Sequence, residues 1–151
     1  MRNVYLLIFL LIGFNSAQAQ VSLSGQPLSA RASFIQATEV SSIRIYAPDF
    51  TVIEAEDALA QANGDAPRYA VHMPLGITME NAGSWMELKG GARIWRLRLE
   101  TQGALATTLL YDQFDLPEGS RLHIYNDDRT SVIGGFSSHN NEDGGTYSTQ
   151  L

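Results

Sequence analysis

The sequence predicts an all-β fold, namely an antiparallel β-sandwich of the jelly-roll kind with one short helix near residues 54–63. Two observations lead to this prediction. Apolar and polar residues alternate in short runs across residues 90–138, which is typical of strands with one buried and one solvent-exposed face. Turn residues, chiefly Gly, Pro, Asn and Asp, separate these runs at the short intervals found in sandwiches.

Residues 1–19 have the pattern of a secretory signal peptide. Arg2 supplies a positive charge, residues 4–14 form an apolar stretch, and a small-x-small cleavage motif ends at Ala19. We expect cleavage between Ala19 and Gln20, so that the mature protein is secreted to the periplasm or the extracellular space. The apolar stretch is too short to span a bilayer, and no later segment reaches membrane length.

The composition narrows the function classes further. The 151 residues contain no cysteine, which excludes disulfides, thiolate catalysis and cysteine-ligated zinc. The net charge is −6 and the single lysine is Lys89, so we do not expect the basic patch that nucleic-acid binding requires. The sequence therefore predicts a secreted protein without a cofactor, whose stability depends on its hydrophobic core.

The mature chain is predicted to begin with a flexible lead-in. Residues 20–40 are rich in Ser and weakly patterned, and we expect the folded domain to span residues 41–151. Within that domain, Ile43 and Ile45 alternate with polar neighbours, which predicts a short edge strand that ends before Pro48.

Residues 54–63 form the only segment that predicts a helix. Glu54, Glu56 and Asp57 are expected in its first turn, where acidic groups complement the helix dipole. Gly64 follows at the position of a left-handed C-cap. Nothing in this helix suggests chemistry.

Three further strands are expected in the middle of the chain. Residues 67–71 begin the β-rich part. Apolar and polar residues alternate clearly over residues 93–100. One face of that second strand carries Trp95, Leu97 and Leu99, and the other carries Arg96, Arg98 and Glu100. Residues 105–111 are a more apolar run, which predicts a central strand.

The last part of the domain predicts hairpins. Leu-Pro-Glu-Gly at 116–119 is a turn, and Asn-Asp-Asp-Arg at 126–129 connects strands at 122–125 and 132–133. A strand begins at Tyr147 just as the sequence ends, so we expect the domain to be truncated at its C-terminal strand.

An ordered series of short motifs over residues 56–151 carries a resemblance. These motifs are Glu-Asp at 56–57, Pro-Arg-Tyr-Ala-Val at 67–71, Ala-Gly-Ser-Trp at 82–85, Gly-Ala-Arg-Ile-Trp-Arg-Leu-Arg at 91–98, Leu-Pro-Glu-Gly at 116–119, Leu-His-Ile-Tyr at 122–125 and Gly-Gly-Phe-Ser at 134–137. In their order and spacing, the chain resembles the amino-terminal, non-catalytic domain of secreted bacterial serine proteases of the lysyl endopeptidase type.

The resemblance implies a pro or accessory domain that precedes a trypsin-like catalytic domain in a secreted precursor. Its partner would be that serine protease domain, normally in the same chain. No catalytic residue is carried over, because the sequence has no Ala-Ala-His-Cys-like context and no Gly-Asp-Ser-Gly-Gly segment. Residues 134–137 also lack the serine between spaced glycines of a nucleophile elbow. We therefore expect no enzyme activity from this chain alone, either as a fragment or as an isolated module.

The three histidines have a structural interpretation. His123 is expected on the solvent face of its strand beside Arg121 and Tyr125, and a catalytic or metal role would need oriented partners there. His72 and His139 have no ligand spacing with another histidine.

Four acidic residues offer the hard oxygen ligands that calcium prefers, namely Asp127, Asp128, Glu142 and Asp143. They do not follow the spacing of an EF-hand loop, and they lie where turns favour Asn and Asp for backbone reasons. Turn chemistry is the preferred interpretation, and a calcium site is the alternative.

Trp85, Arg96 and Arg98 are the candidate contacts to a partner. Trp85 lies in a less regular segment, where core packing and a stacking platform are both open, whereas Trp95 is expected in the core. Arg96 and Arg98 are expected on one wet face, where they would pair with Glu100 or with an acidic partner surface.

Three functions compete at this level. The leading hypothesis is the protease accessory domain, which assists the folding, inhibition or targeting of the protease. The alternative is an independent secreted β-sandwich module that binds carbohydrate or a cell-surface protein. A complete hydrolase has no support in the chain beyond the resemblance.

Overall fold

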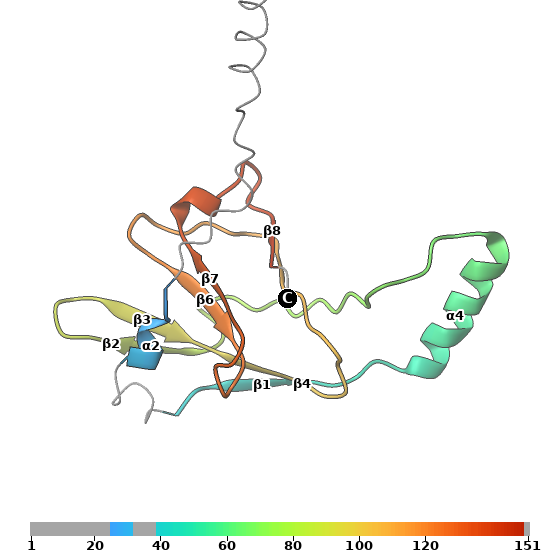
Figure 1. Ribbon diagram of the computed structural model, residues 1–151, viewed down its shortest axis with the longest axis horizontal. Helices are drawn as coiled ribbons and strands as arrows, with labels where there is room; N and C mark the ends of the chain where they lie inside the picture. The colour runs from blue at the N-terminus through green and yellow to red at the C-terminus, as the bar shows by residue number, and fades with distance from the viewer. Residues whose placement is uncertain (1–24, 32–38, 150–151) are drawn as a thin grey trace, which may run out of the picture. The chain divides into compact units, whose positions relative to one another are not determined.

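The computed structural model describes residues 25–31 and 39–149, and Figure 1 traces their course. The expected signal peptide and its cleavage site at Ala19 and Gln20 lie outside the described residues. The described residues contain eight strands and two α-helices, so the fold is mainly β, as predicted. The strands pair in four two-stranded sheets, and the described residues close no sandwich or jelly roll.

The chain divides into two compact units, whereas the sequence suggests one domain over residues 41–151. One unit consists of Met1–Ala32 together with Thr108–Leu151, and we call it the terminal unit. The other consists of Ser33–Thr107, and we call it the central unit.

The central unit contains two strand pairs. Its strand β1 (Ser42–Ile45) pairs with β4 (Arg98–Thr101), and β2 (Ser84–Glu87) pairs with β3 (Arg93–Arg96). The β2–β3 pair is antiparallel, but β1 and β4 are parallel, which differs from the expected antiparallel arrangement. The physical reason is the long connection between β1 and β4, because parallel strands need a crossover rather than a hairpin.

The strand expected at Ile43 and Ile45 is confirmed as β1, in which both isoleucines are half-buried between exposed neighbours. The continuous strand expected over residues 93–100 is wrong, because it breaks at Leu97 between β3 and β4. The two halves hydrogen-bond to different partner strands, so a single alternating face does not form.

Helix α4 (Phe50–Asn63) begins before the predicted helix at residue 54. Asp49 is its N-cap, and the Asp49 side chain accepts a hydrogen bond from the Thr51 backbone N–H at 2.9 Å. The expected acidic first turn is therefore wrong, since no acidic residue lies in the first turn of α4. The C-cap is confirmed: Gly64 adopts a left-handed φ of 84°. No residue of α4 is buried.

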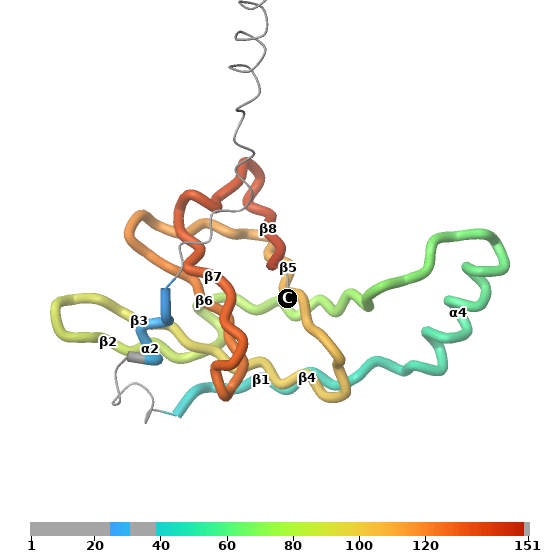
Figure 2. Tube along the Cα trace, in the orientation of Figure 1, coloured from blue at the N-terminus to red at the C-terminus, as the bar shows by residue number. Residues whose placement is uncertain are grey.

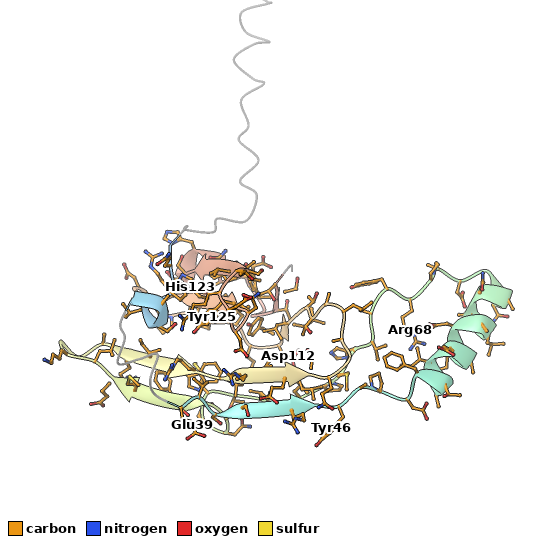
Figure 3. All side chains as sticks on the ribbon, turned by 60° about the horizontal axis from the view of Figure 1, so that its bottom comes forward. Glu39, Tyr46, Arg68, Asp112, His123 and Tyr125 are labelled. Atoms are coloured by element: carbon orange, nitrogen blue, oxygen red, sulfur yellow. The ribbon has the colours of Figure 1, made fainter. Side chains whose placement is uncertain are left out.

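The segment that follows α4 is tied to it by Arg68. In Figure 3 this side chain lies beside the helix, with its guanidinium nitrogens 2.7 Å from a Glu56 carboxylate oxygen and 2.9 Å from one of Asp57. The strand expected over residues 67–71 is wrong, because no strand pairs with this segment and Tyr69 is 99% exposed.

The terminal unit contains the other two strand pairs, both antiparallel. Its β5 (Leu110–Tyr111) pairs with β8 (Tyr147–Ser148), and β6 (Leu122–Tyr125) pairs with β7 (Val132–Phe136), as Figure 2 traces. The hairpin predicted around residues 126–129 is confirmed. The expected central strand over residues 105–111 is reduced to β5, because Leu105 is fully exposed.

The hydrophobic core lies in the terminal unit and is aromatic. Phe114, Phe136 and Tyr147 are buried, with Tyr111 and Leu122 among the side chains packed against them. Phe114 stacks on Tyr147 at 4.4 Å between ring centroids, and Phe136 meets Tyr147 edge-on at 5.4 Å. Such geometries suit the ring quadrupoles and add to the burial of apolar area.

A short helix docks on this unit from the segment expected to be a flexible lead-in. The helix is α2 (Leu28–Arg31), and its buried Ser29 hydroxyl lies 2.7 Å from the Tyr125 hydroxyl. All of β6 is half-buried, and the Nε2 atom of His123 is buried. The expected exposure of His123 is therefore wrong, because both faces of its strand are covered.

Candidate interaction site

The strand pair β2–β3, which we call the interaction ribbon (residues 84–96), places the two tryptophans together. Trp85 lies directly opposite Trp95, and Glu87 lies opposite Arg93. Residues two apart on a strand point to the same side, so these four side chains share one face of the ribbon. We call it the tryptophan face.

Trp85 is fixed in place although it is 49% exposed. Its indole Nε1–H donates to the Met79 carbonyl at 3.2 Å, and the guanidinium carbon of Arg93 lies 4.9 Å from the ring centroid. An arginine in this position is attracted by the negative face of the ring. The result is a rigid, half-exposed aromatic surface with a cation on it, which fits the partner-contact interpretation of Trp85.

Trp95 packs against a neighbouring turn but, contrary to the sequence-based expectation, does not lie in the hydrophobic core. Its indole Nε1–H donates to the Ala82 carbonyl at 2.8 Å, and the residue is half-buried. The ring lies against Gly83, where an added Cβ would come within 2.5 Å of the indole. Gly83 also has a φ of +79°, so this position requires glycine for both space and backbone conformation. The tight turn holds Trp95 and thereby sets the position of the ribbon.

The sequence suggests that Arg96 and Arg98 share one solvent-exposed face, but in the structure they do not. Arg96 ends β3 and is half-buried, whereas Arg98 begins β4, lies opposite Ser42 and is exposed. Both arginines have contacts within the protein. Glu100, the expected intramolecular partner, instead accepts from Arg44 across the β1–β4 pair at 3.1 Å.

The basic residues of the chain are concentrated on the interaction ribbon and its continuation. Four of the ten lie within ten consecutive residues, namely Lys89, Arg93, Arg96 and Arg98, with no acidic residue between them. This local positive charge contrasts with the net charge of −6 of the whole chain. The ribbon therefore carries a local positive charge on an otherwise acidic protein, and such a charge is complementary to an acidic surface.

The four calcium candidates do not assemble into a site. Among the residues the structure covers, no group of three or more His, Asp or Glu side chains is placed to hold a metal ion. Asp128 instead accepts from the Thr130 hydroxyl at 2.8 Å and its backbone N–H at 3.2 Å. These hydrogen bonds lower the pKa of Asp128 by stabilising its carboxylate. Asp127, Glu142 and Asp143 are exposed loop residues.

Ser137 and His139 lie close together in a capping arrangement. The Ser137 Oγ atom is 3.4 Å from His139 Nδ1 and accepts from the His139 backbone N–H at 3.4 Å. Ser137 is the N-cap of the short 3₁₀ helix η1 (Ser138–Asn140), and the Asn140 side chain accepts from the Ser137 backbone N–H at 2.9 Å. This serine is buried as a helix cap and does not present a nucleophile to a substrate.

Two core tyrosines have perturbed acidity. Burial is the larger of two causes that raise the pKa of Tyr111 to about 12, and electrostatic repulsion from Tyr147 is the smaller. Burial also raises the pKa of Tyr147, although the neighbouring Asn140 side chain opposes this shift. Both shifts follow from packing in the aromatic core and mark no catalytic group.

No model of a known protein family matches this chain, and no solved structure matches it either. The resemblance to protease accessory domains therefore stays a prediction. Within the described ranges, no helix combines the length and apolar character that a membrane crossing requires.

The sequence indicated Trp85 but missed how the protein holds it. Arg93 belongs to a visible basic stripe, yet its stacking on Trp85 depends on the register of β2 against β3. The Met79 carbonyl that accepts from Trp85 had no signal in the sequence, because any residue provides a backbone oxygen.

Proposed function

We propose that this chain is the non-catalytic pro or accessory region of a secreted trypsin-like serine protease precursor. It acts by docking on the protease domain, either to occlude the cleft or to stabilise a folding intermediate. The observation that carries the proposal is the ordered motif series over residues 56–151. The secretory pattern of residues 1–19 agrees with a precursor exported to the periplasm or the medium.

The distribution of apolar side chains supports a docking role. Only three hydrophobic side chains are buried in the described residues, whereas fourteen large ones are exposed. Exposed apolar surface on this scale marks contact regions with other proteins. A protease domain is a partner of sufficient size to cover it.

The interaction ribbon supports the same role. It combines a half-exposed tryptophan with a local excess of arginine, and aromatic and arginine side chains are enriched at protein interfaces. We further propose that the strand pairs form part of a jelly-roll-like antiparallel β-sandwich.

The test is a reconstitution with a purified protease of the lysyl endopeptidase type. The purified chain, at micromolar concentration, is expected to slow hydrolysis of a small peptide substrate or to raise the yield of refolded protease. Trp85→Ala should weaken either effect, while Arg121→Gln, a change at an exposed residue of the terminal unit, serves as the control. If the wild-type chain neither slows nor assists the protease, the proposed role is wrong.

An independent binding module is the second candidate, and the tryptophan face favours it. A half-exposed indole stacks well on the apolar face of a sugar ring. Glycan-array binding that is lost in Trp85→Ala would support this function, and an array without signal would count against it.

A further inference from the structure

The tip of the interaction ribbon is exposed to solvent. Residues 89–93 are all exposed, and Figure 2 shows the chain running out of β2 and turning back into β3. Gly90 and Gly91 both have positive φ, and no atom lies within 4 Å of the positions that their Cβ atoms would occupy. A protein that binds the backbone of this tip therefore meets no obstruction from these positions.

Lys89, the single lysine of the chain, lies at this tip. Several arginines of the central unit are engaged elsewhere. Arg44 pairs with Glu100, Arg68 pairs with two carboxylates of α4, and Arg93 stacks on Trp85. Lys89 thus combines an exposed cationic side chain with an accessible, glycine-flanked backbone.

Arg129 provides the closest comparison, because it is also exposed and also lies at a hairpin tip. Its turn is braced by several hydrogen bonds, including Ser131 N–H to Asn126 Oδ1 at 2.9 Å and the Thr130 hydroxyl to Asp128 at 2.8 Å. Between the described residues 88–92 of the Lys89 tip there are only two hydrogen bonds, both between backbone groups, from Leu88 N–H to the Ala92 carbonyl at 2.8 Å and from Gly91 N–H to the Leu88 carbonyl at 3.3 Å. The Lys89 tip therefore opens at lower free energy.

We propose that the Lys89–Gly90 peptide bond is a limited-proteolysis site for serine proteases of the trypsin class. The specificity pocket of such an enzyme holds an acidic group that receives a basic side chain. Exposed loop tips with small residues are also the preferred positions for a proteolytic nick. The protease serine attacks the Lys89 carbonyl carbon, and the Gly90 amine leaves with a proton. Water then hydrolyses the acyl-enzyme and leaves Lys89 with a free carboxylate.

This cut would end the docking of the domain, a consequence that rests on the proposed function. In sequence, β2 and β3 are joined only by the turn at residues 88–92. After cleavage they belong to separate chains, and the tryptophan face loses the effective concentration that the hairpin provides. The protease that the domain covers would thereby release itself.

Limited digestion of the purified full chain with trypsin tests the site. The first fragments detected by mass spectrometry should end at Lys89 and begin at Gly90. Lys89→Gln should abolish this pair and slow the loss of intact chain roughly tenfold, because the other hairpin tip, at Arg129, is braced by side-chain hydrogen bonds and opens at higher free energy. Lys89→Arg should restore the cut, and Arg129→Gln should leave it unchanged. First cleavage after an arginine in the wild-type chain, or unchanged loss in Lys89→Gln, would overturn the proposal.

A time course of protease inhibition separates this inference from the proposed function. Inhibition by each variant is compared with its own initial value: inhibition by the wild-type chain should decay from that value, and inhibition by Lys89→Gln should persist at it. If both variants inhibit and neither effect decays, the release step is wrong and the docking role stands. If neither variant inhibits the protease or raises the yield of refolded protease, the docking role is wrong, and the trypsin digestion alone decides the Lys89 site.

Discussion

The terminal unit and the central unit differ in how they are held together. Every buried hydrophobic side chain among the described residues lies in the terminal unit. Of the fourteen large exposed hydrophobic residues, three lie in the terminal unit (Leu28, Leu110 and Val132), and the other eleven lie in the central unit. Among the described residues, one unit thus has an aromatic core, and the other has half-buried apolar side chains and most of the exposed ones.

The difference bears on the docking role that we propose. Among its described residues the central unit has no buried hydrophobic side chain, and its visible contacts are caps, cross-strand pairs and ion pairs, each of which contributes little by itself. A segment that buries little apolar surface gains most of its stability when a partner covers it. The interaction ribbon and the Lys89 tip both belong to this unit, so the region with the weakest core is the one we assign to docking.

The largest expected effect comes from truncating one buried side chain of the aromatic core. Phe136→Ala removes the edge-on contact with Tyr147 and leaves a cavity, so the free energy of unfolding of the terminal unit should fall by about 3–5 kcal/mol. Urea denaturation followed by near-ultraviolet circular dichroism measures this loss. The control is Leu105→Ala in the central unit, which should change stability by less than about 0.5 kcal/mol. Equal losses in the two variants would contradict the contrast between the units.

Gly83→Ala tests the one tightly packed turn of the central unit. The new methyl group would clash with the Trp95 indole and would force alanine into a positive φ, for an expected loss of about 1–3 kcal/mol. Tryptophan fluorescence reports the resulting displacement of Trp95. Gly90→Ala is the matched control, because its φ is also positive but its Cβ has open space. A loss as large in Gly90→Ala would show that backbone strain, rather than the indole contact, is responsible.

The free energy of unfolding of the terminal unit should decrease at alkaline pH because of a buried tyrosine. Tyrosines in the unfolded chain titrate near pH 10, whereas burial raises the pKa of Tyr111 to about 12. Between these values the folded state keeps a proton that the unfolded state releases, so the stability of the terminal unit falls as the pH rises. The slope from Tyr111 is at most about 1.4 kcal/mol per pH unit.

Tyr111→Phe removes the titrating group while it keeps the ring against Phe114, so the decline with pH should become shallower. Chemical denaturation at pH 9, 10 and 11 measures the change in slope. An unchanged slope in this variant would assign the alkaline sensitivity to other groups.

Local signals in the sequence predicted the local structure well. The Gly64 cap, the turn at residues 126–129 and the strands around Ile43 and His123 follow from period-two alternation and turn chemistry, which act over a few residues. Trp85 was a candidate contact for the same reason, since it lies in a short segment beside a glycine turn.

Long-range partners explain what the sequence could not predict. The break at Leu97 arises because β3 and β4 pair with different strands, and the burial of His123 arises because both faces of β6 are covered. Residues 67–71 alternate like a strand, but no strand lies beside them to accept their hydrogen bonds. In each case the residue pattern is compatible with the expectation, and the missing information is which distant segment becomes the neighbour.

The smallest expected effect concerns Arg68, which ties the segment after α4 to the helix. Arg68→Gln should lower the helical circular dichroism signal slightly, because both carboxylates of Glu56 and Asp57 lose their cation. These groups are partly exposed, so 0.5 M salt should bring the wild-type protein close to the variant. Arg121→Gln, at an exposed arginine with no ion pair among the described residues, should leave the signal unchanged. A variant that loses all helical signal would mean that α4 depends on this contact far more than a surface ion pair allows, and the central unit would then have a structural centre outside the interaction ribbon.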